Sequence, residues 1–229
     1  MQVENLRETG SLIANPDGEA FCCSKPINVL VAEGSNGTVE WIAKFKDEVN
    51  KIGEPLQLSL LKPNHFWYEM KADTVADLVA MVNYGNTLKV VKMNTRSFVN
   101  QRLIRFTAKD HNIEVDLCHA LMNSHIGLFY IEALGFGRGM GALDLNSTKL
   151  RDGYFILDLK LISEAQKQEI LKAFDPIAKR HIEHLTVELT LKDRIYFEET
   201  VALTFGINHI SEKIKEALLS LYLIRTTVK

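Results

Sequence analysis

Apolar residues recur every three or four positions in several stretches of the chain, the spacing of helices that bury one face. This spacing predicts helices at residues 39–52, 74–84, 117–122, 127–134, 163–174, 195–204 and 210–224. Residues at the ends support some of these helices. Ser163 with Gln166, and Thr190 with Asp193, fit the capping-box pattern at a helix start, and Gly206 fits a C-terminal stop.

Short apolar and β-branched runs bounded by turn residues predict strands. They lie at residues 27–31, 57–61, 66–70, 88–93, 103–107 and 154–159. Together these elements predict an α+β fold with mixed or antiparallel sheets, packed helices and a C-terminal helical subdomain. We place the boundary between a first domain, residues 1–177, and a C-terminal helical tail, residues 178–229.

Composition narrows the class of protein. The chain has 229 residues, 46% of them hydrophobic, and a formal net charge of −2, which excludes binding through a polybasic tail. Its three cysteines, Cys22, Cys23 and Cys118, have no paired spacing, so we expect neither a disulfide framework nor a zinc site. No apolar run reaches the roughly 18 residues of a membrane span. The polar start, residues 1–10, does not resemble a signal peptide. We therefore expect a cytoplasmic protein with no membrane partner.

One stretch, residues 85–109, contains six cations and no acidic residue. They are Lys89, Lys92, Arg96, Arg102, Arg105 and Lys109. In a chain of net negative charge this predicts positive potential on one face and a polyanionic ligand. Asn100 and Gln101 precede Arg102, and these three side-chain types bind base edges in DNA. The alternative is a solvated edge strand whose cations protect it from aggregation, but this explains the run from Asn100 to Arg102 poorly.

Four glycines surround Arg138, at Gly135, Gly137, Gly139 and Gly141. They lack the G-x-G-x-x-G spacing and follow a helical pattern, so a nucleotide cofactor site ranks last. A flexible turn is one interpretation. A backbone that approaches a phosphate, with Arg138 supplying charge, is the other, and we favour it slightly.

Catalytic patterns are sparse. Asp110, His111, Asp116, His119 and His125 lie close together in the sequence, but no third ligand follows at matching spacing. Surface residues beside a helix cap are the favoured interpretation. Paired-carboxylate, G-x-S-x-G and Cys-His patterns are absent, so we predict no catalytic residue and no metal site.

Several short motifs resemble the target-recognition (specificity) domain of the N6-adenine DNA methyltransferases of restriction–modification systems. They are Arg102-Leu103-Ile104-Arg105, Leu121-Met122-Asn123-Ser124, Phe129-Tyr130-Ile131-Glu132 and Gly139-Met140-Gly141-Ala142-Leu143-Asp144-Leu145. Members of that family have an asparagine-serine pair leading a helix, a glycine-rich link and an Ala-Leu-Asp-Leu stretch. The similarity is best between about residues 96 and 177.

The resemblance implies that residues 1–177 bind double-stranded DNA. The family's glycine-bearing S-adenosylmethionine motif and its Asn-Pro-Pro-Tyr/Phe motif are both missing, since Asn15-Pro16 is followed by Asp17-Gly18. The chain is therefore expected to be a specificity module without enzymatic activity or cofactor of its own. Catalysis and S-adenosylmethionine binding would belong to a methyltransferase domain in cis or in trans.

In this interpretation, the phosphate contacts come from Lys89, Lys92, Arg138 and Lys149, and base edges are read by Arg96, Asn100, Gln101 and Arg102. The remaining DNA-binding candidates are Arg105, Asn123, Ser124, Gly137 and Gly139. An alternative function is a protein-interaction module that docks a catalytic subunit through the C-terminal helices. Its candidate surface, the Ile214, Leu218 and Leu221 stripe, is more simply explained as ordinary core.

Overall fold

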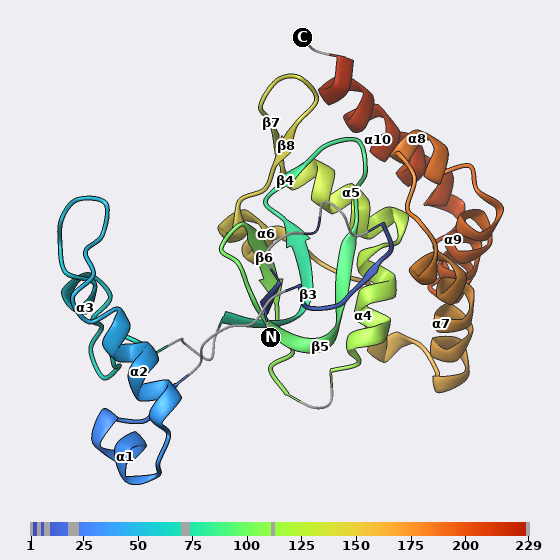
Figure 1. Ribbon diagram of the computed structural model, residues 1–229. Coiled ribbons are helices and arrows are strands. Elements are labelled where there is room, and N and C mark those ends of the chain that lie inside the picture. The colour runs from blue at the N-terminus through green and yellow to red at the C-terminus, as the bar shows by residue number, and fades with distance from the viewer. Residues whose placement is uncertain are drawn as a thin grey trace. The chain divides into compact units, whose positions relative to one another are not determined.

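The computed structural model describes residues 2–3, 6, 10–17, 23–69, 74–110 and 113–227 (Figure 1). The chain forms two compact units. We call residues 1–18 with 75–229 the main unit, and residues 19–74 the inserted unit.

The larger sheet of the main unit is organised around one long strand, β5. Its strands are β1 (Gln2–Val3), β2 (Ile13–Ala14), β3 (Val75–Met81), β5 (Val90–Val99) and β6 (Leu103–Phe106). The order is β1-β5-β3-β6, with β2 also on β5. Strands β1 and β2 run parallel to β5, whereas β3 is antiparallel to both β5 and β6. The register between β3 and β5 shifts between Ala76 and Leu78, where Asn94 to Arg96 bulge out of the ladder.

A smaller antiparallel sheet follows, in the order β4-β8-β7. It consists of β4 (Asn83–Tyr84), β7 (Phe136–Gly137) and β8 (Leu143–Asp144). The hairpin that joins β7 to β8 contains the glycine cluster.

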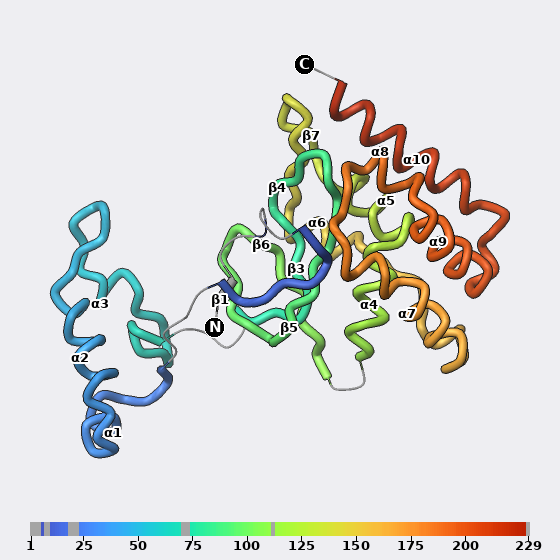
Figure 2. Tube along the Cα trace, turned by 45° about the vertical axis from the view of Figure 1, so that its right-hand side comes forward, coloured from blue at the N-terminus to red at the C-terminus, as the bar shows by residue number. Residues whose placement is uncertain are grey.

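Helices make up most of the rest of the main unit. They are α4 (Val115–Met122), α5 (His125–Leu134), α6 (Ser147–Gly153), the 3-10 turn η2 (Leu159–Leu161), α7 (Glu164–Lys179), α8 (Leu185–Glu188), α9 (Lys192–Thr204) and α10 (Asn208–Thr227). Helices α4 and α5 lie between the larger sheet and α7, α9 and α10, as both views of the main unit show (Figures 1 and 2).

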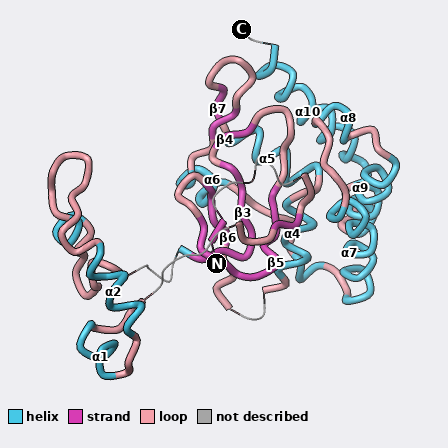
Figure 3. The backbone as a smooth tube through the Cα atoms, viewed as in Figure 1, coloured by secondary structure: helices cyan, strands magenta, loops and turns pink. Residues whose placement is uncertain are grey.

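Side chains along each strand alternate between the two faces of the sheet. In the larger sheet, both faces are covered by a core. Leu78 and Ile104 face a core that includes Met122 and Leu128 of the helices. Val79 and Leu103 face a second core that the N-terminal segment closes with Leu6 and Ala14. A third core packs α4 against α7 and α9. The predicted α+β fold with C-terminal helices is confirmed (Figure 3).

The helices predicted near the motifs are confirmed. Helices α4 and α5 break at Asn123 and Ser124, and Ser124 caps α5. Ser163 and Gln166 form the predicted capping box of α7, which continues past Pro176 to Lys179. Helix α7 runs across the boundary placed after residue 177, so this boundary does not fall between two elements. The division into a recognition domain and a C-terminal tail stays a prediction.

The predicted helix at 74–84 was wrong, because this stretch is strand β3 followed by β4. Leu78, Val79 and Ala80 are all buried. A strand covered on both faces has a continuous apolar run, which matches a helical spacing as well as a strand pattern.

Other local predictions were also wrong. Residues 27–31 and 57–61 are not strands but lie in or overlap short helices, α1 (Ile27–Ala32) and α3 (Leu56–Ser59). The helix predicted at 39–52 is α2 (Asn36–Lys44). Residues 66–69 and 154–158 form no strand, and Met70 lies outside the described residues. The second capping box does not form, because the carboxylate of Asp193 binds Arg180.

The inserted unit has a small core of Cys23, Leu30, Ile42 and Tyr68. Cys23 and Cys118 are free thiols, and Cys22 lies outside the described residues. Across the described ranges, no helix has both the length and the apolar character needed to cross a membrane. The cytoplasmic location stays a prediction.

Candidate nucleic-acid interface

The turn between β5 and β6 contains three of the four predicted base-reading residues, Asn100, Gln101 and Arg102. Asn100 folds the turn itself: its Oδ1 accepts a hydrogen bond from the Arg102 backbone N–H at 3.0 Å. Its carbonyl oxygen accepts another from Leu103, also at 3.0 Å. Gln101 and Arg102 are exposed, and among the described residues Arg102 has no ion-pair partner. The turn therefore presents an amide and a guanidinium to solvent on a fixed backbone.

Backbone hydrogen bonds connect this turn to the smaller sheet. The N–H of Val82 donates to the carbonyl oxygen of Arg102 at 3.2 Å, and the N–H of Leu145 donates to that of Val82 at 2.8 Å. Leu145 follows strand β8, whose Asp144 binds Arg138 at 2.7 Å. The turn at Arg102 is thus connected through Val82 to the residue that follows Asp144, the ion-pair partner of Arg138.

Lys149 lies four residues after Leu145, in the first turn of α6. The side chain of Asn146 caps this helix and accepts hydrogen bonds from the N–H groups of Thr148 and Lys149. Lys149 is exposed, and the described residues give its side chain no ion-pair partner. We call Gln101, Arg102, Arg138 and Lys149 the cationic surface.

The glycine hairpin packs against the end of α10. Gly139 and Gly141 have φ angles of +86° and +77°, which residues with a Cβ rarely adopt. A Cβ on Gly141 would lie 3.6 Å from Thr226 of α10, and the carbonyl of Gly141 accepts a hydrogen bond from Arg225. The glycines therefore permit a tight turn and a close approach to a helix. Phosphate contact by Gly137 and Gly139 stays a prediction.

Two other cations of the basic stretch have acidic partners from outside it, so the expectation of six cations without a counter-charge was wrong, and DNA contact by Lys92, Arg96 and Arg105 stays a prediction. Lys92 forms an ion pair with Asp116 on α4. Arg96 lies in the β5 bulge, with its Nε 3.7 Å from Asp77. Arg105 is exposed on β6, on the opposite side of that strand from the helix-facing Ile104. Charge spacing could not reveal these different destinations, because acidic partners from distant segments determine them.

Three further candidates are buried in this structure. Lys89 is only 6% exposed, and burial lowers the pKa of its ammonium group. Asn123 joins the sheet to the helices: it accepts a hydrogen bond from the N–H of Val90 at 3.0 Å and donates to the Val90 carbonyl at 2.8 Å. Ser124 caps α5 through the N–H of Gly127. Their contact with DNA stays a prediction, and we do not include them in the cationic surface.

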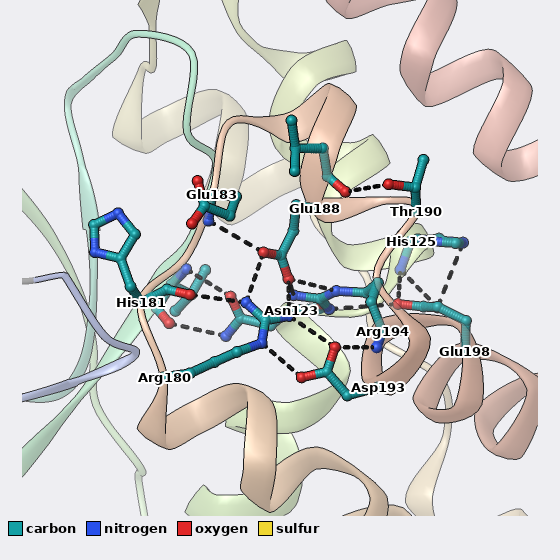
Figure 4. Close-up of polar contacts among 12 residues, drawn as sticks. Asn123, His125, Arg180, His181, Glu183, Glu188, Thr190, Asp193, Arg194 and Glu198 are labelled. Atoms are coloured by element: carbon teal, nitrogen blue, oxygen red, sulfur yellow. Dashed lines mark hydrogen bonds and ion pairs between the residues drawn. The ribbon is translucent and has the colours of Figure 1, made fainter.

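A buried ionic network surrounds the junction at Asn123 (Figure 4). Arg194, which is 1% exposed, donates to the carbonyl oxygen of Asn123 at 2.7 Å. It also donates twice to Glu188, at 2.8 and 3.0 Å. Arg180 donates to both oxygens of Glu188 at 2.8 Å and to Asp193. The network ties α7, α8 and α9 to the break between α4 and α5.

Glu198 and His125 extend this network as a buried pair. The backbone N–H of His125 donates to both carboxylate oxygens of Glu198, at 3.0 and 2.9 Å. Burial raises the pKa of Glu198 to about 7 although Arg194 opposes the shift, and burial lowers the pKa of His125 to about 3. His119 is also buried, with its pKa lowered to about 4. The interpretation of these two histidines as surface residues was therefore wrong.

No pattern along the chain pointed to this network. Arg194 and Glu198 are four residues apart in a helix, which is also the spacing of an ordinary surface pair. His111 lies outside the described residues, and no group of three potential metal ligands occurs in the ranges that are described.

Comparison with known proteins relates the fold to a restriction–modification enzyme. No family model matches the sequence, and no curated protein matches it. Among solved structures, the chain is similar to the type IIG restriction endonuclease BpuSI, with a TM-score of 0.59 and 15% identity. The alignment covers 98% of this chain and 26% of the BpuSI chain, so this chain spans about a quarter of that protein's length. The likeness shows a common fold with part of such an enzyme.

Proposed function

We propose that this chain binds double-stranded DNA in a sequence-specific manner, as the target-recognition part of an N6-adenine DNA methyltransferase or a fused restriction–modification enzyme. The cationic surface is the observation on which this proposal rests. It combines a fixed turn, which exposes Gln101 and Arg102, with the phosphate-binding candidates Arg138 and Lys149. The fold similarity to part of BpuSI supports the same proposal.

The arrangement suits separate sets of contacts to DNA phosphates and to base edges. Lysine and arginine contacts to phosphates fix register and orientation, whereas base edges carry the sequence information. An arginine on a fixed turn can bind a guanine edge with two hydrogen bonds, worth about 1–3 kcal/mol of discrimination. We therefore assign base reading to Gln101 and Arg102, and phosphate binding to Lys149 and Arg138.

We further propose that the chain is not itself an enzyme. Adenine N6 is stacked inside the duplex, so a methyltransferase must extrude the base, and a separate domain can grip the site meanwhile. The S-adenosylmethionine motif and the Asn-Pro-Pro-Tyr motif are absent from this sequence. A methyltransferase domain, in cis or in trans, would bind the cofactor and perform the transfer.

Selection from a pool of randomised duplexes tests the proposal. We expect the chain to enrich a consensus sequence and its affinity to fall steeply with salt. Arg102→Ala should relax the preference at one position of the consensus. Lys149→Ala should weaken binding to all sequences alike and reduce the salt slope by about one. Lys172, an exposed residue of α7, provides the matched control, because α7 lies well apart from the β7–β8 hairpin in both views (Figures 1 and 2).

The two parts of the proposal can fail separately. Salt-dependent binding without any consensus would refute sequence recognition and leave DNA binding intact. The absence of salt-dependent binding would refute both. An unchanged salt slope in Lys149→Ala would remove that residue from the phosphate contacts.

The alternative, docking of a catalytic subunit through the C-terminal helices, has less support. The stripe on α10 packs inward, since Leu218 is fully buried in the core below α5. Exposed apolar side chains remain on α9 and α10, at Tyr196, Leu203 and Ile224. They are separated along two helices, and we therefore favour DNA as the ligand.

A further inference from the structure

The tip of the β7–β8 hairpin displays one apolar side chain, Met140, which is 99% exposed. Its φ angle of +49° is uncommon for a residue with a Cβ, and both neighbouring glycines also have positive φ angles. Three such residues in succession turn the chain sharply and leave Met140 at the apex. Burial would stabilise an apolar side chain, so an unfavourable backbone that exposes one points to binding and not to folding.

The hairpin below Met140 is firmly held. The N–H of Arg138 donates to the carbonyl of Ala142 at 3.0 Å, and the N–H of Ala142 donates to that of Gly139 at 3.1 Å. From α10, Arg225 donates to the carbonyl of Gly141 and is itself bound by the buried Glu132, with Nε and Oε1 2.6 Å apart. A hairpin that is already ordered by these hydrogen bonds loses little conformational entropy when it binds a ligand.

The charges around Met140 favour DNA over an apolar protein surface. Arg138, two residues earlier, has a side chain that is 69% exposed, although its Nε forms an ion pair with Asp144 at 2.7 Å. Through Val82, backbone hydrogen bonds connect Arg102 to Leu145 at the base of the hairpin. A duplex has phosphates outside and apolar stacked faces within, which matches an apolar side chain at the hairpin tip with a cation beside it. Unbranched and branched apolar side chains, methionine among them, act as wedges between base steps.

We propose that Met140 inserts between neighbouring base pairs of the bound duplex and partly unstacks one step. This inference rests on the DNA-binding function proposed above and adds the contact that deforms the DNA. Unstacking beside the target lowers the work of extruding a base for the methyltransferase part. Met140 would be a positioning residue for that reaction.

A duplex with a single abasic site tests the wedge, because its stack is already open. A protein that must unstack a step should bind this duplex about tenfold more tightly than the intact one. We expect the preference in the wild-type chain, its loss in Met140→Ala and its retention in Met140→Leu, measured by fluorescence anisotropy on short duplexes. Leu203→Ala removes a similarly exposed apolar side chain from α9 and should leave the preference unchanged.

The outcomes separate the wedge from DNA binding itself. Salt-dependent binding to both duplexes with equal affinity, or a preference that survives in Met140→Ala, overturns the wedge and leaves the proposed function standing. The absence of binding to either duplex refutes the proposed function. A preference lost equally in Leu203→Ala would assign it to general apolar contact and also overturn the wedge.

Discussion

The junction at Asn123 and the turn at Arg102 use the same types of residue for opposite purposes. At the junction, an asparagine and an arginine are buried, and each satisfies backbone groups of a distant segment. At the turn, Asn100 satisfies only its own loop, and Arg102 is left exposed with no ion pair among the described residues. The comparison shows that the chemistry of a side chain does not decide whether it is buried in the fold or left exposed. The density of partners around it does.

Arg194→Met should give the largest effect and would test the junction directly. The substitution removes the hydrogen bonds to Asn123 and Glu188 and leaves buried carboxylates with one cation fewer. Breaking a buried ion pair from one side costs about 3–5 kcal/mol of unfolding free energy. Urea denaturation monitored by circular dichroism measures it. A loss below about 1 kcal/mol would show that the network is dispensable for stability.

Glu198→Gln should give an intermediate and pH-dependent effect. Burial raises the pKa of Glu198 in the folded protein to about 7 from its ordinary value of 4.5, so folding takes up a proton between these pH values. Its contribution to the free energy of unfolding is complete below about pH 4.5 and is lost as the pH rises through about 7. His125, with a lowered pKa, works in the opposite direction at lower pH, and Arg194 and Glu188 also face the carboxyl group.

The difference between wild type and Glu198→Gln isolates this contribution. Relative to the variant, the wild type should lose on the order of 1–3 kcal/mol between about pH 5 and about pH 8. Denaturation midpoints at several pH values within that range provide the measurement. A difference independent of pH would mean that the carboxyl group is ionised throughout the range in the folded protein, as it is in the unfolded chain, and that its pKa is not raised.

Arg102→Met should give the smallest effect and completes the contrast with Arg194→Met. Exposed side chains without tertiary partners change the unfolding free energy by about 0.5 kcal/mol or less. The same denaturation experiment applies, so one substitution type is compared at a buried and at an exposed arginine. A large loss at Arg102 would show that the turn contributes to the fold and would weaken its assignment to DNA.

Local signals in the sequence were reliable where neighbours along the chain determine the structure. The break between α4 and α5 follows from Ser124 as a cap, and the start of α7 follows from Ser163 and Gln166. Strand β6 matches the strand predicted at 103–107, whereas the strand predicted at 88–93 covers only the first part of β5. The predicted break between the two helices identified where the junction lies, but not that a buried ionic network surrounds it.

Signals that depend on distant partners failed. Strand β3 was assigned to a helix because burial on both faces removes the alternation that identifies a strand. The cations of the basic stretch separate because Asp77 and Asp116 meet two of them from other elements. Met140 could not be singled out either, since its exposure depends on how the hairpin packs against α10.

The shared attachment of β2 and β3 to β5 has a consequence for how such a protein can change over time. The inserted unit leaves the main unit after β2 and returns at β3, and β5 pairs with both strands. Its points of departure and return are therefore fixed by one ladder, whatever lies between them. Evolution can lengthen, shorten or exchange that segment without disturbing the register of the scaffold.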